Sequence, residues 1–440
     1  MIIDSSANDD SFDIDRDVIG AGPIGVTQIT VFCVAVALNI LDGFDVTSMS
    51  FTAHGIGEQL KIPPDQLGLV FSIALAGMMI GAMFIAPLSD VVGRRRVVLL
   101  SATAIGASML ATGFCNSLWQ LVVLRLITGL GVGGMLASLA AITSEFTPEK
   151  YRSLAVVCVT AGYPLGATLG GFIAAPMIPL YGWHSVFFVG GGATLALVVV
   201  AYFLIPESLH FLAVKRPANA LEKFNAVLSR LGRPTLMELP NIPSDEHAKA
   251  NVFSLLSPAR RRTTITLWLT FFFCFICLYF LLSWIPKLVI LSGLSESQGV
   301  YASVAFNAGA LLGVGCLGWL SARTSLSSLI GVFLLLGAVG MLLFALFDGA
   351  RMLISSLLAI GFLLQGGFTG LYAVAAKVYP TELRSTGVGW AIGIGRFGAV
   401  VGPYVGGILI ARSVPMEANF IIYAIPLMLS GLLALMLKVR

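Results

Sequence analysis

The sequence predicts an all-α membrane protein with twelve transmembrane helices in two parallel six-helix halves. Of its 440 residues, 57% are hydrophobic and only 11% are charged, whereas an ordinary soluble domain has roughly 25% charged residues. Apolar runs of about 20 residues, the length that crosses a bilayer as a helix, recur along the chain. A sequence pattern in the first part also recurs at a fixed offset in the second. These three observations together define the predicted fold class.

The elements follow one another with short connections, except at the middle of the chain. Residues 1–26 contain six aspartates and one arginine, and without a basic start ahead of an apolar core they are interpreted as a solvated acidic tail rather than a signal peptide. The first half, 27–206, contains the predicted spans 27–49, 66–86, 97–115, 118–144, 153–176 and 183–205. After a charged central loop, 207–262, the second half, 263–440, contains the predicted spans 263–291, 298–320, 325–347, 351–378, 385–411 and 416–437.

The orientation is predicted from the positions of Lys and Arg, which collect on the cytoplasmic side of membrane proteins. If both termini are cytoplasmic, the tails and the even-numbered loops hold 20 of the 26 basic residues. The formal net charge of +4 therefore reflects membrane topology and does not indicate a nucleic-acid partner.

A repeat with an offset of 232 residues relates the two halves. The pattern P-x-x-x-R-S occurs at 148–153 and again at 380–385. At the same offset, two glycines four residues apart recur: Gly166 and Gly170 correspond to Gly398 and Gly402. Parallel repeats of this kind are typical of transporters in which one half rocks against the other around a central site, and small residues permit the close helix contacts that such sliding needs.

Four ionisable residues remain deep in predicted spans once the loop charges are assigned: Asp42, Asp45, Arg125 and Arg396. A charge at the bilayer centre costs roughly 2.5 to 3.5 kcal/mol, so such groups usually face a cavity and pair with one another. Asp42 and Asp45 are three residues apart and therefore share one helix face. We expect at least one of them to couple transport to protons. The alternative is that both serve as structural partners of the arginines.

Arg125 and Arg396 suggest an anionic substrate, because the planar guanidinium group binds a carboxylate through two parallel hydrogen bonds. Here too the alternative is that each arginine only neutralises an aspartate. Phe44, Trp390 and Tyr404 lie near these charges in the sequence and are candidates for contacts with a planar substrate, although aromatic residues in spans more often serve packing or anchor the helix at the interface.

No cofactor, metal site or enzymatic activity is predicted. The two GxGxxG matches, at 129–134 and 393–398, follow no strand, so close helix packing explains them better than nucleotide binding. The six cysteines are spread over the spans, where packing is the better explanation. No nucleophilic catalytic constellation and no phosphate-binding loop is present.

The loop after the second span resembles the signature of the major facilitator superfamily. It reads Pro87-Leu-Ser-Asp90-Val-Val-Gly93-Arg94-Arg95, with Ala86 and Val91 where the family usually has a glycine and a basic residue. The corresponding loop after the eighth span matches the signature less well, with Ala322 in place of the acid. The resemblance implies that these loops and the region of Glu145 and Arg152 form cytoplasmic ion pairs that hold the outward-open state. The predicted gating residues are Asp90, Gly93, Arg94, Glu145, Arg152 and Arg384.

Three further stretches resemble the aromatic acid:proton symporter family within that superfamily. They are the DGFD run at 42–45, the run RLITGLG at 125–131 and, most specifically, the long run at 379–398. The resemblance implies a monomeric importer in a bacterial inner membrane that carries a benzoate-like acid together with protons and needs its first-span aspartates. Two alternatives stay open: a carrier of a non-aromatic acid such as a muconate or a ring-cleavage lactone, and a membrane sensor of such acids.

Overall fold

The computed structural model describes residues 14–20, 22–240, 252–258, 260–344, 349–379 and 381–437, and all its regular elements within these ranges are helices. The first group comprises η1 (Ile14–Ile19), α1 (Val26–Leu60), α2 (Pro64–Ile80), η2 (Gly81–Ile85), η3 (Ala86–Leu88), α3 (Ser89–Val92), α4 (Arg94–Thr112), α5 (Leu118–Glu145), α6 (Glu149–Tyr181) and α7 (His184–Leu204). Then come α8 (Leu209–Lys215), α9 (Ala220–Arg230), η4 (Val252–Leu256), α10 (Arg261–Leu291), α11 (Glu296–Ser321), α12 (Leu326–Phe344), α13 (Ala350–Val378), α14 (Thr381–Ala411) and α15 (Met416–Met436).

Among the described residues, eleven helices are long and apolar enough to cross a membrane. The predicted span that is missing from this set corresponds to α4, which begins with three arginines and lies against α5 and α7. The first helix also differs from its prediction. It continues past residue 49 and ends only at Leu60, where Lys61 adopts a left-handed conformation with φ 54°, so the two aspartates do not interrupt it.

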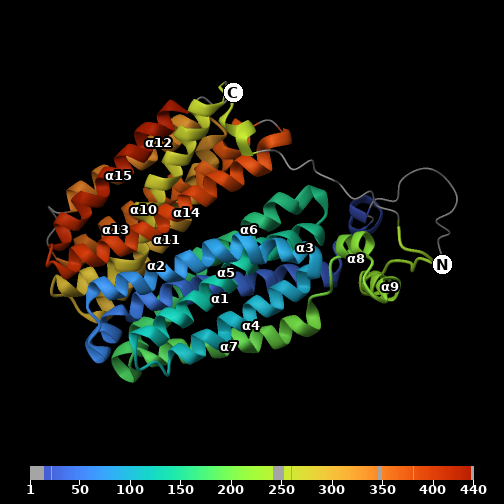
Figure 1. Ribbon diagram of the computed structural model, residues 1–440, viewed down its shortest axis with the longest axis horizontal. Helices are drawn as coiled ribbons and strands as arrows, with labels where there is room; N and C mark the ends of the chain where they lie inside the picture. The colour runs from blue at the N-terminus through green and yellow to red at the C-terminus, as the bar shows by residue number, and fades with distance from the viewer. Residues whose placement is uncertain are drawn as a thin grey trace.

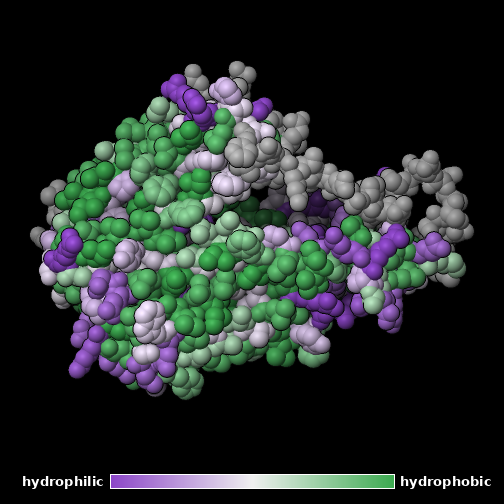
Figure 2. Space-filling model, viewed as in Figure 1, coloured by the Kyte–Doolittle hydropathy of each residue, from purple (hydrophilic) through white to green (hydrophobic). Residues whose placement is uncertain are grey.

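The long helices fall into two groups. In Figure 1, α1 to α7 occupy the lower part of the molecule and α10 to α15 the upper left. Most contacts between the groups come from three helix pairs, namely α2 with α14, α6 with α11 and α1 with α10, and α1 also touches α11. Away from these contacts the groups diverge toward the end that carries α8 and α9, and Figure 2 shows the surface hollowed between them there.

Glycine packing repeats at the same offset of 232 residues as the sequence pattern. A Cβ atom on Gly166 of α6 would lie 1.8 Å from the carbonyl oxygen of Ile40 on α1. A Cβ atom on Gly398 of α14 would lie 2.2 Å from the carbonyl oxygen of Phe272 on α10. Only glycine permits such an approach of two backbones, so α6 packs on α1 as α14 packs on α10.

Polar contacts between the two groups gather at one end of the molecule. Ser50 Oγ donates to the carbonyl oxygen of Ser283 at 2.9 Å, and Ser297 Oγ donates to that of Ala175 at 3.0 Å. Nearer the middle, Ser72 Oγ donates to the carbonyl oxygen of Val400 at 2.7 Å. In the described part of the chain, no hydrogen bond or ion pair joins the groups near the end with α8 and α9. The conformation is therefore sealed at one end and open at the other.

One face of the described N-terminal tail is packed against the protein, while other tail residues are exposed as expected. Ile14, Val18 and Ile19 of η1 are buried, and Arg233 Nε donates to the carbonyl oxygen of Val18 at 2.9 Å. The aspartates dominate the composition of the tail, but these three apolar residues provide a face that docks beside α8 and α9.

Candidate functional site

The site begins with α1, which carries both predicted carboxyl groups. Asp42 and Asp45 are 2% and 0% exposed. Between them, Gly43 lets α1 approach α6 so closely that a Cβ atom there would lie 2.0 Å from the carbonyl oxygen of Tyr163. This contact fixes the rotation of α1 and keeps both carboxyl groups inside the molecule.

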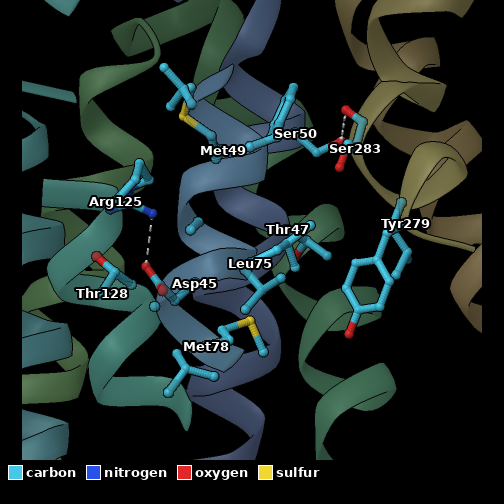
Figure 3. Close-up of a pocket in the computed structure, with 17 residues that line it drawn as sticks. Asp45, Thr47, Met49, Ser50, Leu75, Met78, Arg125, Thr128, Tyr279 and Ser283 are labelled. Carbon is cyan, nitrogen blue, oxygen red and sulfur yellow. Dashed lines mark hydrogen bonds and ion pairs between the residues drawn. The ribbon is translucent and has the colours of Figure 1, made fainter. Parts of the chain in front are cut away.

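Asp45 forms an ion pair with Arg125 of α5. Arg125 Nη1 lies 3.5 Å from Asp45 Oδ1, and the arginine is 2% exposed. Arg125 Nη2 also donates to Thr112 Oγ1 at 2.9 Å, and its guanidinium carbon lies 5.4 Å from the centre of the Phe187 ring. Figure 3 shows the two charged side chains pointing toward each other. All these partners belong to the first group of helices, so this arginine is held within that group.

Arg396 of α14 has a different environment, because its direct partner is neutral. Its Nη1 atom donates to the hydroxyl of Tyr279 at 3.1 Å, and its guanidinium carbon lies 5.8 Å from the centre of the Phe275 ring. Tyr163, Tyr372 and Asp42 lie within electrostatic reach. Asp42 Oδ1 is buried with no hydrogen-bond partner among the described residues. The structure therefore places a carboxyl group of the first group, with one oxygen unpaired among the described residues, within electrostatic reach of the arginine of the second.

An aromatic cluster surrounds Arg396 on the side of the second group. The Phe275 ring stacks on Tyr279 at 5.6 Å and meets Phe368 edge-on at 5.0 Å. Tyr372 contacts Phe368 at 5.3 Å and Phe271 at 5.5 Å. Aromatic rings prefer such tilted and offset contacts, so the second group surrounds the guanidinium group with packed aromatic rings.

A small cavity separates the Asp45–Arg125 pair from Tyr279. Its volume is about 40 Å³, enough for one or two water molecules and far below the roughly 150 Å³ of an engineered cavity that holds benzene. As Figure 3 shows, Ser50 and Ser283 lie at one end of it. In this conformation the Asp45–Arg125 pair therefore has room for water but not for an aromatic ring.

The structure does not bring the three predicted aromatic contacts to this site. Phe44 is buried against Gly170 and Gly190, on the side of α1 that faces α6 and α7. Trp390 and Tyr404 are exposed and lie about 80° to 120° around α14 from Arg396. Trp390 stacks on the ring of Trp268 at 6.0 Å. Proximity in sequence misled here, because neighbours along a helix project in different directions.

Four of the predicted gating residues lie together at the open end. Arg94 Nε lies 2.6 Å from Glu145 Oε1, and Arg94 Nη2 lies 3.3 Å from Asp90 Oδ1. Gly93 makes this turn possible, because its φ of 115° is strained for other residues. Glu207 joins the turn by accepting a hydrogen bond from the backbone amide of Arg95 at 3.0 Å.

The other two predicted gating residues have different outcomes. Arg152 Nη2 pairs with Asp15 of the N-terminal segment at 3.0 Å, and Arg152 Nε donates to the carbonyl oxygen of Ser144 at 3.0 Å. The side chain of Arg384 lies outside the described residues. The observed ion pairs of this region all join parts of the first group or its tail, so in this conformation they do not bridge the two groups.

Two residues of α10 were missed by the sequence analysis. Tyr279 contacts Arg396 and also lines the small cavity, but a tyrosine among phenylalanines gives no signal of its own. Lys287 is not among the four deep charges expected from the sequence, yet it is only 6% exposed. Its position one helical turn after Ser283, on the face that meets α1, could not be recognised without the contact between the two groups.

The comparisons with known proteins agree with this architecture. The model of the Major Facilitator Superfamily matches residues 35–391 and 306–440. The chain belongs to this superfamily, and within it to the aromatic acid:proton symporter family. It is 33% identical over 403 residues to the 4-hydroxybenzoate transporter PcaK of Acinetobacter baylyi, covering 90% of this chain and 88% of the relative. It is also 33% identical over 420 residues to a gallate transporter of Pseudomonas putida, covering 93% and 92%.

Solved structures of the major facilitator superfamily share the fold. A bacterial homologue of the lysosomal transporter Spinster, in an inward-facing and occupied conformation, matches with a TM-score of 0.74 at 14% identity, covering 97% of each chain. A D-xylose–proton symporter matches with a TM-score of 0.73 at 16% identity, covering 92% of this chain and 97% of that one. Membership of this superfamily of membrane transporters confirms the prediction that the chain is not an enzyme.

Proposed function

We propose that this protein is a proton-coupled symporter that imports an aromatic, benzoate-like carboxylic acid across a bacterial inner membrane. The observation that carries the proposal is the environment of Arg396: a permanently charged guanidinium group beside stacked aromatic rings, bonded to the neutral hydroxyl of Tyr279 and within electrostatic reach of Asp42 of the first group. The names of the relatives, which include 4-hydroxybenzoate, gallate and benzoate transporters, support the same substrate class.

The proposed architecture has twelve spans in two six-helix halves with both termini in the cytoplasm. We count α4 as the twelfth span, since it packs lengthwise beside α5 and α7, and its arginines then lie at the cytoplasmic surface. The open end of the molecule carries α8, α9 and the N-terminal segment, so the present conformation is inward-open. A monomer is the proposed working unit, because both arginines and both aspartates come from one chain.

The free-energy cost of freeing each arginine from its present partner gives the two arginines different roles. If the substrate carboxylate bound Arg125, the buried pair of Arg125 with Asp45 would break, and separating such a pair costs roughly 3 to 5 kcal/mol. If the substrate carboxylate bound Arg396, only the hydrogen bond of Arg396 to Tyr279 would be lost. A hydrogen bond to a charged group contributes roughly 1.5 to 3 kcal/mol, and two parallel hydrogen bonds to the carboxylate would replace it. Arg396 is therefore the substrate residue, and Arg125 holds Asp45.

The transport cycle then follows from competition for Arg396. While Asp42 is ionised it attracts Arg396 and repels an incoming carboxylate, so a substrate anion binds well only after Asp42 has taken up a proton. The loaded halves rock together, and proton loss on the cytoplasmic side restores the repulsion and expels the substrate. Asp45 and the water-sized cavity beside it provide a proton relay within the first half.

The decisive experiment measures uptake into proteoliposomes. Labelled benzoate, 4-hydroxybenzoate and a muconate are offered singly, with and without an imposed inward proton gradient. We expect gradient-driven accumulation of the aromatic acids, abolished by an uncoupler. Accumulation of the muconate alone would instead favour the non-aromatic carrier. Saturable binding without accumulation of any acid would favour a sensor and reject the proposal.

A further inference from the structure

Lys287 is a buried cation where the two groups of helices meet at the sealed end of the molecule, near the hydrogen bond between Ser50 and Ser283. We call this contact the seam and this end the outer end. It lies on α10, in the second group of helices, and is 6% exposed. Its ammonium group reaches across the seam to the last turn of α1, where a Cβ atom on Gly57 would lie 3.0 Å from Lys287 Nζ. Glu58 of the same turn lies within electrostatic reach. Neither the Asp45–Arg125 pair nor the Arg396 site uses this lysine.

The last turn of α1 attracts a cation for a physical reason. The carbonyl groups at a helix C-terminus carry a partial negative charge, and a nearby cation is stabilised by it. Because α1 and α10 belong to different groups, this attraction exists only while the seam is closed. It thus favours the conformation that is open at the other end.

Lys287 also lies on the path from the outer end to the substrate site. On α10 it follows Ser283 by one turn and Tyr279 by two, about 12 Å along the helix axis. Ser283 and Tyr279 line the small cavity, and Tyr279 bonds Arg396. When the halves separate at the outer end, Lys287 loses α1 and becomes a positive charge on the wall above Tyr279 and Arg396.

We propose that Lys287 is a gating and substrate-capturing residue, which exchanges the C-terminal turn of α1 for the carboxylate of the arriving acid when the outer end opens. The second step rests on the proposed function, since it requires an anionic substrate. The first step does not, because closing the seam involves only groups of this chain.

The first step is tested by thiol labelling from outside, without substrate. Ser283→Cys places a reporter in the seam, and it preserves the seam hydrogen bond because Ser50 donates to the main-chain oxygen of residue 283. A membrane-impermeant maleimide labels right-side-out vesicles, and the labelling of the chain without the added cysteine is subtracted. Lys287→Gln should accelerate labelling about 2- to 30-fold, the range for losing a cation at a helix C-terminus. Lys287→Arg, which keeps the charge, should stay within about 2-fold of the parent.

The matched control is Lys61→Gln, which removes one positive charge from the same end of the molecule at an exposed position just beyond α1. Labelling of Lys287→Gln that is no faster than that of Lys61→Gln would overturn the gating step. Slower labelling would overturn it as well, because the burial cost of the ammonium group would then exceed its attraction to α1.

The capture step is tested by initial uptake rates. Lys287→Gln should raise the KM for the acid more than Lys61→Gln does, and the difference should shrink as salt screens the charge. An equal KM in both variants would reject capture while leaving the labelling result intact. Failure of the unmodified protein to take up any acid would reject the proposed function instead, so the two failures are distinguishable.

Discussion

Removing one member of the buried ion pair should destabilise the protein at least as much as removing both. Asp45→Asn leaves the guanidinium group of Arg125, 2% exposed, with Thr112 as its remaining hydrogen-bond partner among the described residues. An uncompensated charge created in this way costs roughly 3 to 5 kcal/mol. The double variant Asp45→Asn with Arg125→Gln removes that charge, so we expect it to be no less stable than either single variant. The coupling energy is then at least about 3 kcal/mol.

Unfolding can be followed in detergent with a thiol-reactive fluorescent dye, because Cys115, Cys274 and Cys277 are free and buried in the folded chain. The control is Asp90→Asn, the same chemical change at an exposed carboxyl group that pairs with Arg94 at 3.3 Å. Surface pairs contribute at most about 1 kcal/mol. The reasoning fails if Asp45→Asn destabilises the protein no more than this control. It also fails if the two single effects add in the double variant.

Three further outcomes are expected. Arg396→Lys keeps the charge but loses the two-pronged fork, so the KM for the acid in uptake assays should rise about 10- to 100-fold; an unchanged value would contradict its role. Tyr279→Phe keeps the ring but removes the hydroxyl that the substrate carboxylate must displace from Arg396, so the KM should fall about 10-fold or more, whereas an unaltered or raised KM would show that this hydroxyl does not compete with the substrate. Gly166→Val and Gly398→Val each drive a side chain into a facing carbonyl group, so both should abolish the yield of monodisperse protein in detergent, while Gly192→Val, with nothing within 4 Å, should be purified normally.

Much of the fold could be predicted because apolar length and glycine spacing are local properties. The expected spans coincide with long helices of the structure, and the offset of 232 residues reappears in the contacts of Gly166 and Gly398. The end of α1 could not be predicted in the same way. The expected boundary at residue 49 is followed by polar residues, but Ser50 and Thr52 are buried and α1 packs on α10 and α11, so the helix continues to Leu60.

The candidate site was predicted in its composition but not in its pairings. Charged residues stand out in apolar spans, which is why the four deep charges were found from sequence alone. Which arginine meets which aspartate depends on how three helices, α1, α5 and α14, are rotated about their axes, and the sequence does not determine this. Aromatic residues were a weaker signal, because the chain has 28 phenylalanines, most of which serve packing; Phe44 proved to be one of these, while Tyr279 was overlooked.

The asymmetry between the two aspartates leads to the last prediction. Asp45 has an arginine at 3.5 Å, whereas Asp42 forms no ion pair with a described residue, although Asp45 and Arg396 lie within its electrostatic reach. Asp42→Asn therefore mimics the protonated state permanently and breaks no ion pair. It should still exchange labelled for unlabelled acid across the membrane, because Arg396 remains free to bind a carboxylate, but it should no longer accumulate acid in response to a proton gradient. Asp45→Asn should impair exchange as well, since it disturbs the fold around Arg125. If Asp42→Asn retained gradient-driven accumulation, the proton would have to bind elsewhere, and competition for Arg396 could not be the coupling step.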